Sequence, residues 1–256
     1  MSAYAQGAEQ DSLQQKRIEK FESWKWRISP YAWVPAIRGR VTTPSVFPSQ
    51  LPEPPPPFFD FKLLVKDLRS HLKFLSVISA EYRSDRFLFA GRFDALVIES
   101  QPVFILESLL DQTLVDFALY SADLFGGYRF LTDEKVHLDG LVGLRMLHLN
   151  VGVHTLVFGN EIGATQKKTY WDPVLGARLK YLPHYRWELI FYADITPIPL
   201  ESNFSFQGVS VITYHFNPHF FLAPGYRFVG HRKTDDEVTY FDGNIRGFYL
   251  RIGFQF

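Results

Sequence analysis

The chain has 256 residues, in which 27 Lys and Arg balance 27 Asp and Glu, and it contains no cysteine. The zero net charge excludes a protein steered to nucleic acid by its overall charge, and the missing cysteines exclude disulfides, thiol catalysis and Cys-ligated zinc. Aromatic residues make up 17% of the chain, which favours a membrane β-barrel, with its aromatic lipid band and interfacial girdles, over a soluble domain.

The N-terminal stretch, residues 1–22, is polar and rich in Gln, Glu and Lys. Its apolar residues Leu13, Ile18 and Phe21 are too sparse to predict a firm helix. We expect a short periplasmic tail or helical turn over 1–22, followed by a single barrel domain over 23–256.

The segment Ser2-Ala3-Tyr4-Ala5-Gln6 has the A-x-A shape of a signal-peptidase site, but neither a charged n-region nor an apolar h-region precedes it. One interpretation is that a signal peptide has been removed ahead of this sequence, or that the start is misplaced. The other is a chance pair of alanines in a polar terminus. The first interpretation predicts export to the bacterial outer membrane.

The first strand is predicted from residue 24, because successive side chains of a strand point to opposite faces. One parity holds Trp24, Trp26 and Ile28, and the other holds Lys25, Arg27 and Ser29. The paired tryptophans predict an anchor at the membrane interface.

Residues 41–59 form a Pro-rich loop that ends in Pro54-Pro-Pro-Pro57, which predicts a stiff polyproline II spacer. Asp60 is placed to cap a short amphipathic helix over 60–72. Helical spacing is kept by Phe61, Leu64, Val65, Leu68 and Leu72. The apolar side of this helix has to pack on the barrel mouth, the lipid surface or a partner protein.

Period-2 alternation then predicts nine further strands, at 72–83, 86–97, 113–130, 136–146, 171–181, 187–195, 204–216, 220–228 and 246–256. The connections alternate in length: they are tight near 84, 133, 184 and 217, and long near 50, 105, 163, 199 and 236. The long connection near 163 is predicted as a polar loop over 159–169.

Short periplasmic turns and longer extracellular loops are typical of outer-membrane barrels, whereas a soluble sandwich has no reason to alternate its loop lengths. The predicted fold is therefore all-β: a closed antiparallel up-and-down transmembrane β-barrel of about 10 strands, with the short amphipathic helix in a long outer loop.

The last strand has one continuously apolar face, and a terminal Phe is a common assembly signal of bacterial barrels. The predicted lipid-facing residues of this strand are Phe248, Leu250, Ile252, Phe254 and Phe256.

Charged residues recur on the opposite parity, which faces the barrel lumen. They are Lys73, Glu81, Arg83, Arg92, Asp94, Asp139, Arg145, Asp172, Arg178, Glu188, Asp194, Arg227 and Arg251. Both signs are interleaved, and a barrel of about 10 strands encloses little more than its own side chains. The charges predict either a structural salt-bridge network that fills the lumen or a narrow polar conduit.

Catalytic signals are weak. His231 with Asp235 and Asp236 lies in one outer loop, and His148 and His154 lie near the outer end of another strand. No Gly-x-Ser-x-Gly nucleophile signature or metal-ligand spacing is present, so we predict no enzyme activity, no catalytic or metal site and no cofactor.

Four motifs resemble a group of uncharacterised Gram-negative outer-membrane β-barrel proteins over roughly residues 24–256. They are Trp26-x-x-x-Pro30-Tyr31-x-Trp33-x-Pro35, Asp172-Pro173-Val174-x-Gly176-Ala177-Arg178, Pro224-Gly225-Tyr226-Arg227 and the closing Gly253-Phe-x-Phe256. The resemblance implies the barrel fold and says little about activity. The Pro-rich segments at 47–57 and 197–199 depart from the Gly-rich connections of that group.

These observations predict an integral outer-membrane barrel with a packed polar lumen, acting as a structural or accessory subunit of a larger outer-membrane assembly. A narrow small-solute channel is the alternative, and a surface-exposed hydrolase is a weaker one. The expected partners are outer-membrane lipid, the barrel-assembly machinery during biogenesis and, for an accessory subunit, another outer-membrane protein. No nucleic acid is expected.

Overall fold

The computed structural model describes residues 2–42, 58–63, 72–102, 113–157, 160–197, 203–233 and 241–256. Within these residues one helix precedes eleven strands. The bounds are α1 Ser2–Glu22, β1 Trp26–Thr42, β2 Phe58–Leu63, β3 Leu72–Ser84, β4 Phe87–Pro102, β5 Thr113–Thr132, β6 Val136–Val157, β7 Asn160–His184, β8 Trp187–Ile195, β9 Asn203–Asn217, β10 Phe220–Lys233 and β11 Phe241–Gln255.

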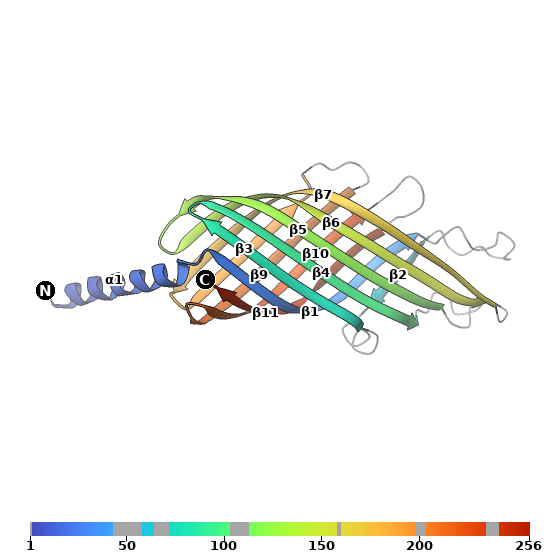
Figure 1. Cartoon of the computed structure of the whole chain (residues 1–256), viewed down its shortest axis with the longest axis horizontal. Helices are drawn as coiled ribbons and strands as arrows, with labels where there is room; N and C mark the ends of the chain where they lie inside the picture. The colour runs from blue at the N-terminus through green and yellow to red at the C-terminus, as the bar shows by residue number, and fades with distance from the viewer. Residues whose placement is uncertain are drawn as a thin grey trace.

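The strands close into an antiparallel barrel in which neighbours follow the order of the chain (Figure 1). β3 to β11 pair in sequence, and β11 returns to pair with β1, where Tyr31 lies opposite Arg251. β1 pairs with β3 along Trp26–Pro30 and with β2 along Ile37–Thr42, so β2 and β3 share one place in the wall. Because β2 and β3 occupy a single position beside β1, the eleven strands form a barrel with ten strand positions. This confirms the predicted closed antiparallel barrel of about 10 strands.

Both termini lie at the same end of the barrel as the short turns that join β3 to β4, β5 to β6, β7 to β8 and β9 to β10 (Figure 1). The strand ends that lead into the other connections lie at the opposite end. At the β3–β4 turn Asp85 has a φ of 50°, a left-handed conformation that Asp tolerates better than most residues. The four predicted tight turns are confirmed.

The N-terminal stretch is a helix of 21 residues, which corrects the prediction of a tail or a single helical turn. Ala, Gln, Glu and Lys have high helix propensity, so the helix does not need a continuous apolar stripe. Its C-terminal end packs on the barrel, since Ile18 and Phe21 are buried whereas Leu13 is 50% exposed. Ile18 and Phe21 therefore mark where the helix docks.

The helix predicted over 60–72 is wrong at both of its ends. Asp60 and Phe61 lie in β2, and Leu72 begins β3, while Leu64, Val65 and Leu68 lie outside the described residues. The outer half of β1 needs a ladder partner, because unpaired backbone groups at a strand edge are costly in a membrane. Phe58–Leu63 supplies that partner.

The polar loop predicted over 159–169 is also wrong, because β7 already begins at Asn160, directly opposite Val157 of β6. Thr165, Lys167 and Thr169 are exposed polar residues of this strand. A hairpin that extends beyond the lipid can be polar on both faces, so its strands lack the alternation by which a membrane strand is recognised.

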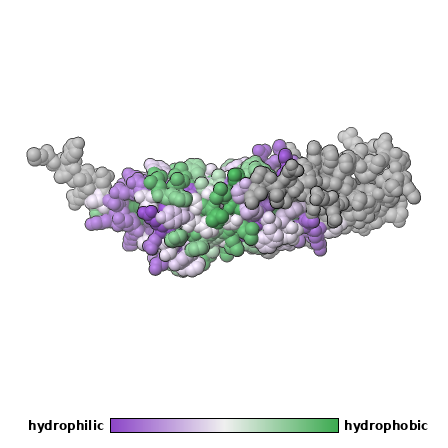
Figure 2. All heavy atoms as spheres, turned by 90° about the horizontal axis from the view of Figure 1, so that it is seen from above, coloured by the Kyte–Doolittle hydropathy of each residue, from purple (hydrophilic) through white to green (hydrophobic). Residues whose placement is uncertain are grey.

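The barrel exterior carries a belt of large apolar side chains. On β11 the exposed fractions of the predicted lipid-facing residues run from 41% for Ile252 to 73% for Phe248. Hydrophobic residues gather around the middle of the barrel, and hydrophilic residues gather at the end that carries α1 (Figure 2). A continuous apolar belt of this kind is typical of the lipid-facing surface of a membrane β-barrel. Among the described residues, no helix combines the length and apolar character needed to cross a membrane.

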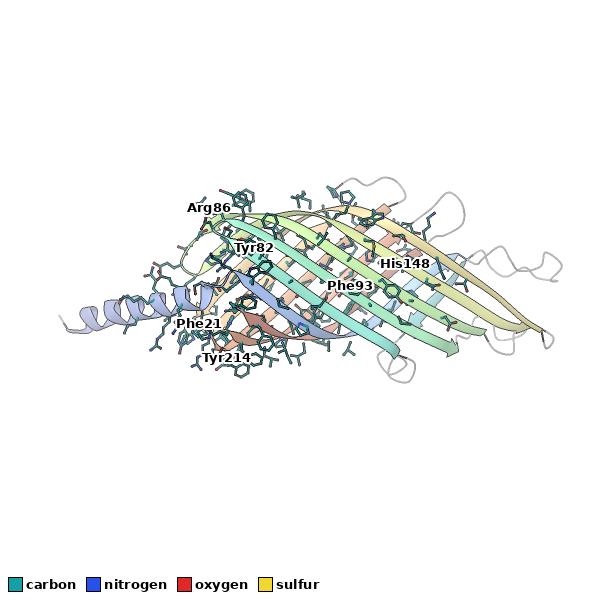
Figure 3. The ribbon with its side chains drawn as sticks, viewed as in Figure 1. Phe21, Tyr82, Arg86, Phe93, His148 and Tyr214 are labelled. Atoms are coloured by element: carbon teal, nitrogen blue, oxygen red, sulfur yellow. The ribbon has the colours of Figure 1, made fainter. Side chains whose placement is uncertain are left out.

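Aromatic pairs line the exterior near the end that carries α1. The rings of Trp26 and Tyr82 are 4.7 Å apart, and those of Trp187 and Tyr214 are 4.9 Å apart; Tyr82 and Tyr214 are labelled in Figure 3. Trp24 does not belong to this girdle, which corrects the predicted pair of interface tryptophans. It precedes β1, so strand parity does not apply to it, and its side chain is buried inside the barrel mouth at 5% exposure.

The lumen is not uniformly polar. Apolar side chains occupy many inward positions, and the buried apolar cluster consists of Trp33, Ile37, Leu96, Ile98, Phe117, Leu119, Leu147, Leu149, Tyr170, Ile190, Val211, Phe221, Ala223, Val229, Ile245 and Tyr249. The charged residues are therefore packed between layers of hydrophobic side chains.

Candidate functional site: the charged layers of the lumen

The thirteen charged residues predicted to face the lumen all lie on strands. Nine of them are at most 9% exposed: Asp94, Asp139, Arg145, Asp172, Arg178, Glu188, Asp194, Arg227 and Arg251. The side chains of Glu81, Arg83 and Arg92 are 13%, 11% and 16% exposed. Lys73 lies in β3, and its side chain is outside the description. The structure divides the described residues into a middle layer and a layer near the end that carries α1.

Arg145 of β6 is the centre of the middle layer. Its Nε donates to Asp123 Oδ1 at 2.8 Å, and its Nη2 donates to both oxygens of Asp194 at 2.9 and 2.8 Å. Its Nη1 donates to Ser205 Oγ at 3.4 Å. At 1% exposure Arg145 has exchanged water for two carboxylates and a hydroxyl. Such charge-assisted bonds in a low-dielectric interior are stronger than those at a surface.

Other contacts of the middle layer cross the barrel. Arg227 of β10 donates to Asp94 of β4 through Nη1 at 2.8 Å, and Arg92 of β4 donates to Gln207 of β9 at 2.9 Å. Five places separate β4 from β9 in the ten-place wall, so these strands are opposite each other. Arg92 also pairs with Asp123. The middle layer thus joins opposite walls, and the space between them is occupied by side chains.

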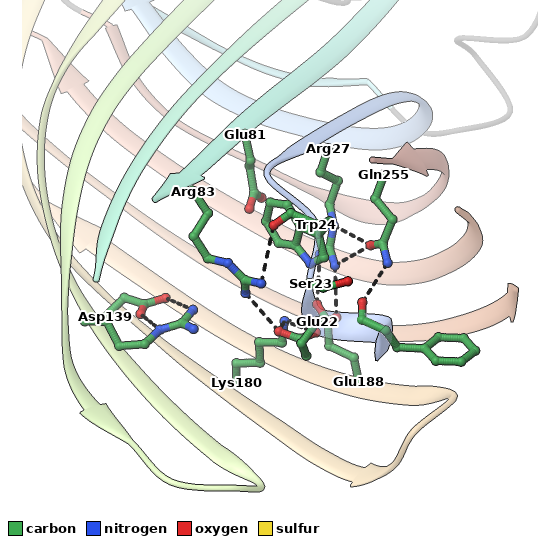
Figure 4. Close-up of polar contacts among 12 residues, drawn as sticks. Glu22, Ser23, Trp24, Arg27, Glu81, Arg83, Asp139, Lys180, Glu188 and Gln255 are labelled. Carbon is green, nitrogen blue, oxygen red and sulfur yellow. Dashed lines mark hydrogen bonds and ion pairs between the residues drawn. The ribbon is translucent and has the colours of Figure 1, made fainter. Parts of the chain in front are cut away.

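The second layer lies at the end that carries α1 (Figure 4). Arg27 of β1 donates to Glu188 of β8 through Nη1 at 3.0 Å and through Nη2 at 3.2 Å. Arg178 of β7 reaches Glu81 of β3 at 3.0 Å and Asp139 of β6 at 2.7 Å. The Arg27–Glu188 and Arg178–Glu81 pairs also span the lumen, whereas Asp139 lies directly opposite Arg178 on the neighbouring strand.

Helix α1 closes onto this layer through its last residue. The carboxylate of Glu22 accepts from Lys180 at 2.7 Å and from Arg83 at 2.9 Å (Figure 4). The guanidinium carbons of Arg27 and Arg83 each lie 4.3 Å from the centre of the Trp24 ring, within cation–π distance. We call these contacts, from Glu22 and Trp24 to Arg27, Arg83 and Lys180, the helix latch.

Apolar contacts complete the docking of α1. The ring of Phe21 lies edge-on to Tyr185 at 5.4 Å and to His215 at 5.9 Å, and Figure 3 places Phe21 where the helix meets the barrel. The backbone carbonyl of Phe21 accepts from Gln255 Nε2 at 2.9 Å. The C-terminal end of α1 is therefore bound to the barrel wall by apolar contacts and by a hydrogen bond from Gln255, next to the C-terminus of the chain.

Sequence reasoning missed several members of these layers. Arg27 and Lys180 had the correct parity but were not included, and Asp123 of β5 shares the inward parity of its strand. Glu22 lies outside any strand, so no alternation could indicate it. Parity assigns a side chain to a face, but it does not identify a partner across the lumen.

The catalytic candidates are not brought together in the part of the chain that the structure describes. His231 is buried in β10 at 5% exposure, and Asp235 and Asp236 lie outside the described residues. His148 contacts Thr169 Oγ1 at 2.8 Å on the half of the barrel away from α1 (Figure 3), and His154 pairs in the β6–β7 ladder opposite Gly163. Over the same residues, no group of three His, Cys, Asp or Glu could hold a metal ion.

The helix latch predicts a measurable effect of Glu22→Gln. The amide keeps the shape of the side chain but removes the charge that pairs with Lys180 and Arg83, so we expect α1 to leave the barrel mouth more often. Trypsin should then cut the folded variant several-fold faster within α1, at Arg17 and Lys20. Glu19→Gln on the exposed face of the same helix is the matched control and should be cut at the wild-type rate. Equal rates for both variants would show that Phe21 and Ile18 alone hold the helix.

The latch also predicts how docking of α1 depends on pH. Burial by itself would raise the pKa of Glu22, but the cations Lys180, Arg83 and Arg27 outweigh it, and the pKa falls from 4.5 to about 2. A carboxylate with a lowered pKa stabilises docking fully above pH 4.5, and this contribution disappears as the pH falls towards 2. A spin label on Leu13→Cys, in a chain with no native cysteine, should therefore remain equally immobile from pH 7 to 5 and gain mobility only below that.

No protein-family model matches this chain, and no curated protein matches it. The chain is similar in structure to the outer membrane protease OmpT from Escherichia coli, with a TM-score of 0.54 and 9% identity over 91% of this chain and 96% of that one. Ail of Yersinia pestis gives a TM-score of 0.35 at 14% identity, over 91% of this chain and 99% of that one. The toluene transporter TodX of Pseudomonas putida gives 0.35 at 8%, over 94% and 92%. The likeness to OmpT shows that this chain has the fold of outer-membrane β-barrels.

Proposed function

We propose that this protein is a non-conducting barrel of the bacterial outer membrane, with a structural role or the role of an accessory subunit in a larger outer-membrane assembly. The observation that carries the proposal is the set of charged contacts that cross the lumen, such as Arg27 to Glu188 and Arg227 to Asp94. A solute path along the barrel axis would have to break these contacts, and separating buried ion pairs is costly.

The position of α1 supports the accessory role. Short turns and chain termini face the periplasm in outer-membrane barrels, so the end that carries α1 is periplasmic. From its docked end at Glu22 the helix projects away from the barrel (Figure 1). A closed barrel does not need such a helix for its own stability, but a partner on the periplasmic side could bind it. Partners then include lipid, the assembly machinery and, in the accessory role, another outer-membrane protein.

Planar-bilayer recording tests the packed lumen. We expect the purified, folded protein to give no discrete openings above the background of the detergent alone. Openings whose conductance changes in Arg27→Gln would instead favour the narrow channel.

Extraction of wild-type protein from its native membrane in mild detergent distinguishes the two remaining roles. An accessory subunit should co-migrate with a second protein, and a purely structural barrel should not.

The hydrolase alternative has no support among the described residues. OmpT is a protease, but at 9% identity the likeness extends to the fold alone. His231 is buried, the described side-chain contact of His148 is the hydroxyl of Thr169, and the side chain of His154 lies outside the description. The absence of enzyme activity stays a prediction.

A further inference from the structure

Arg251 differs from the other arginines of the lumen. It lies on β11 with 9% exposure, and its Nε and Nη2 make no hydrogen bond to any described residue. Its guanidinium carbon lies 5.5 Å from the centre of the Phe221 ring. Arg27, Arg145 and Arg178 each make two or more hydrogen bonds to carboxylates in the same lumen. A buried guanidinium with idle donors is costly unless something else accepts from it.

The side chain of Arg251 lines a cavity of about 120 Å³ inside the barrel, between the two charged layers. Arg92, Arg178 and Arg227 line it too, whereas Glu81 is the only carboxylate among its lining residues. Glu81 already accepts from Arg178 at 3.0 Å. Arg92, Arg178 and Arg227 are already engaged by Asp123, Asp139 and Asp94. Arg251 is therefore the lining cation with idle donors, and those donors favour an anion over a neutral guest.

Much of the remaining lining of the cavity is apolar. Leu88, Phe125, Leu141, Ile190 and Val211 contribute to it. An inorganic phosphate or sulfate would leave some of its oxygens against these hydrocarbon groups with no donor, which is unfavourable. A carboxylate with a short alkyl group matches both sides, because its oxygens accept from the guanidinium while its chain contacts the leucines.

Size limits the length of that chain. An apolar cavity of about 150 Å³ is known to hold benzene, which has six carbons. A cavity of about 120 Å³ therefore suits a guest slightly smaller than benzene. We propose that the barrel binds a short-chain monocarboxylate, from acetate to butyrate, in this cavity, with its carboxylate on Arg251 and its alkyl group against Leu88 and Leu141.

The experiment uses the folded, detergent-solubilised chain, purified in carboxylate-free buffer and titrated with propionate by calorimetry. We expect saturable binding of one propionate per barrel. Arg251→Met should weaken it at least tenfold, and this variant should still fold, because it removes buried donors that have no hydrogen-bond acceptor. Heat-modifiable migration in mild detergent verifies folding of each variant.

A second pair of variants tests the cavity itself. Ala90→Leu adds volume at the cavity wall while Arg251 is kept, so it should also abolish binding. Ala193→Leu adds the same side chain on the exposed outer face of β8 and should leave binding unchanged. The proposal is overturned if wild-type protein shows no saturable binding, if Arg251→Met binds propionate as tightly as wild type, or if chloride or phosphate competes as well as butyrate does.

Discussion

Arg145→Leu is expected to destabilise the folded barrel by about 3–5 kcal/mol, the usual cost of removing one partner from a buried ion pair. Leucine fills much of the volume, but it removes the ion pair of Asp194 and leaves Asp123 with Arg92 as its remaining cation. The buried Asp194 carboxylate would have to take up a proton or admit water. Urea titration of the protein in detergent micelles, followed by heat-modifiable migration, measures the loss as a lower midpoint.

Two comparisons separate this effect from a general intolerance to substitution. Arg246→Leu changes the same residue type at an exposed position of β11 and should leave the midpoint within experimental error. Combining Arg145→Leu with Asp123→Asn and Asp194→Asn removes the stranded charges and should recover part of the lost stability. If Arg145→Leu alone is as stable as Arg246→Leu, the middle layer does not stabilise the barrel, and the structural role proposed for it is wrong.

The barrel itself could be predicted because lipid on the outside imposes a strict period of two. Along β7, for example, Trp171, Leu175 and Leu179 are exposed, whereas the intervening Asp172 and Arg178 are buried. The lipid face selects apolar side chains, and the packed lumen selects residues that can pair or pack inside the barrel. Each strand therefore carries two signals with the same period of two residues. The tight turns add a third signal, since their positions define where each strand ends.

Prediction failed where a segment leaves the membrane or leaves the strand. The outer half of β7, residues 160–169, is polar at most positions of both parities, so its alternation disappears although its ladder with β6 continues to Asn160. Residues 60–63 were assigned to a helix because a short apolar segment suits either period, and pairing with β1 decided the outcome. Trp24 and Glu22 point inward because α1 docks, a tertiary contact that no local pattern encodes.

The lumen shows a different limit. Parity placed Arg27 and Glu188 on the inner face, but 161 residues separate them, and nothing local indicates that they bind each other. Inward positions are also not all polar, because Trp33 and Ile37 follow Arg27 on the inner face of β1. Which inward residues carry charge, and which pack as hydrocarbon, depends on what the opposite wall presents at the same height.

Leu250→Arg is the second substitution expected to have a large effect. Leu250 lies within the apolar belt at 45% exposure, opposite Ala32 of β1 and Pro224 of β10. A lipid-facing arginine near the bilayer midplane costs about 2–4 kcal/mol, and the cost falls to about 0–1 kcal/mol near the interface. We expect a lower urea midpoint and less assembled, heat-modifiable protein in the outer membrane.

Leu131→Arg is the matched control, because Leu131 has nearly the same exposure, 47%, but lies beside the turn after β5, at the end of the barrel that carries α1. A soluble barrel would have no lipid and hence no dependence on depth, so it would penalise the two exposed leucines alike. A larger loss of stability for Leu250→Arg than for Leu131→Arg would therefore indicate that the barrel lies in a membrane. Wild-type protein should also stay in the membrane pellet after a carbonate wash. If it remains soluble without detergent when exported, the apolar belt faces a partner or a ligand instead of lipid, and a secreted ligand-binding barrel becomes the better interpretation.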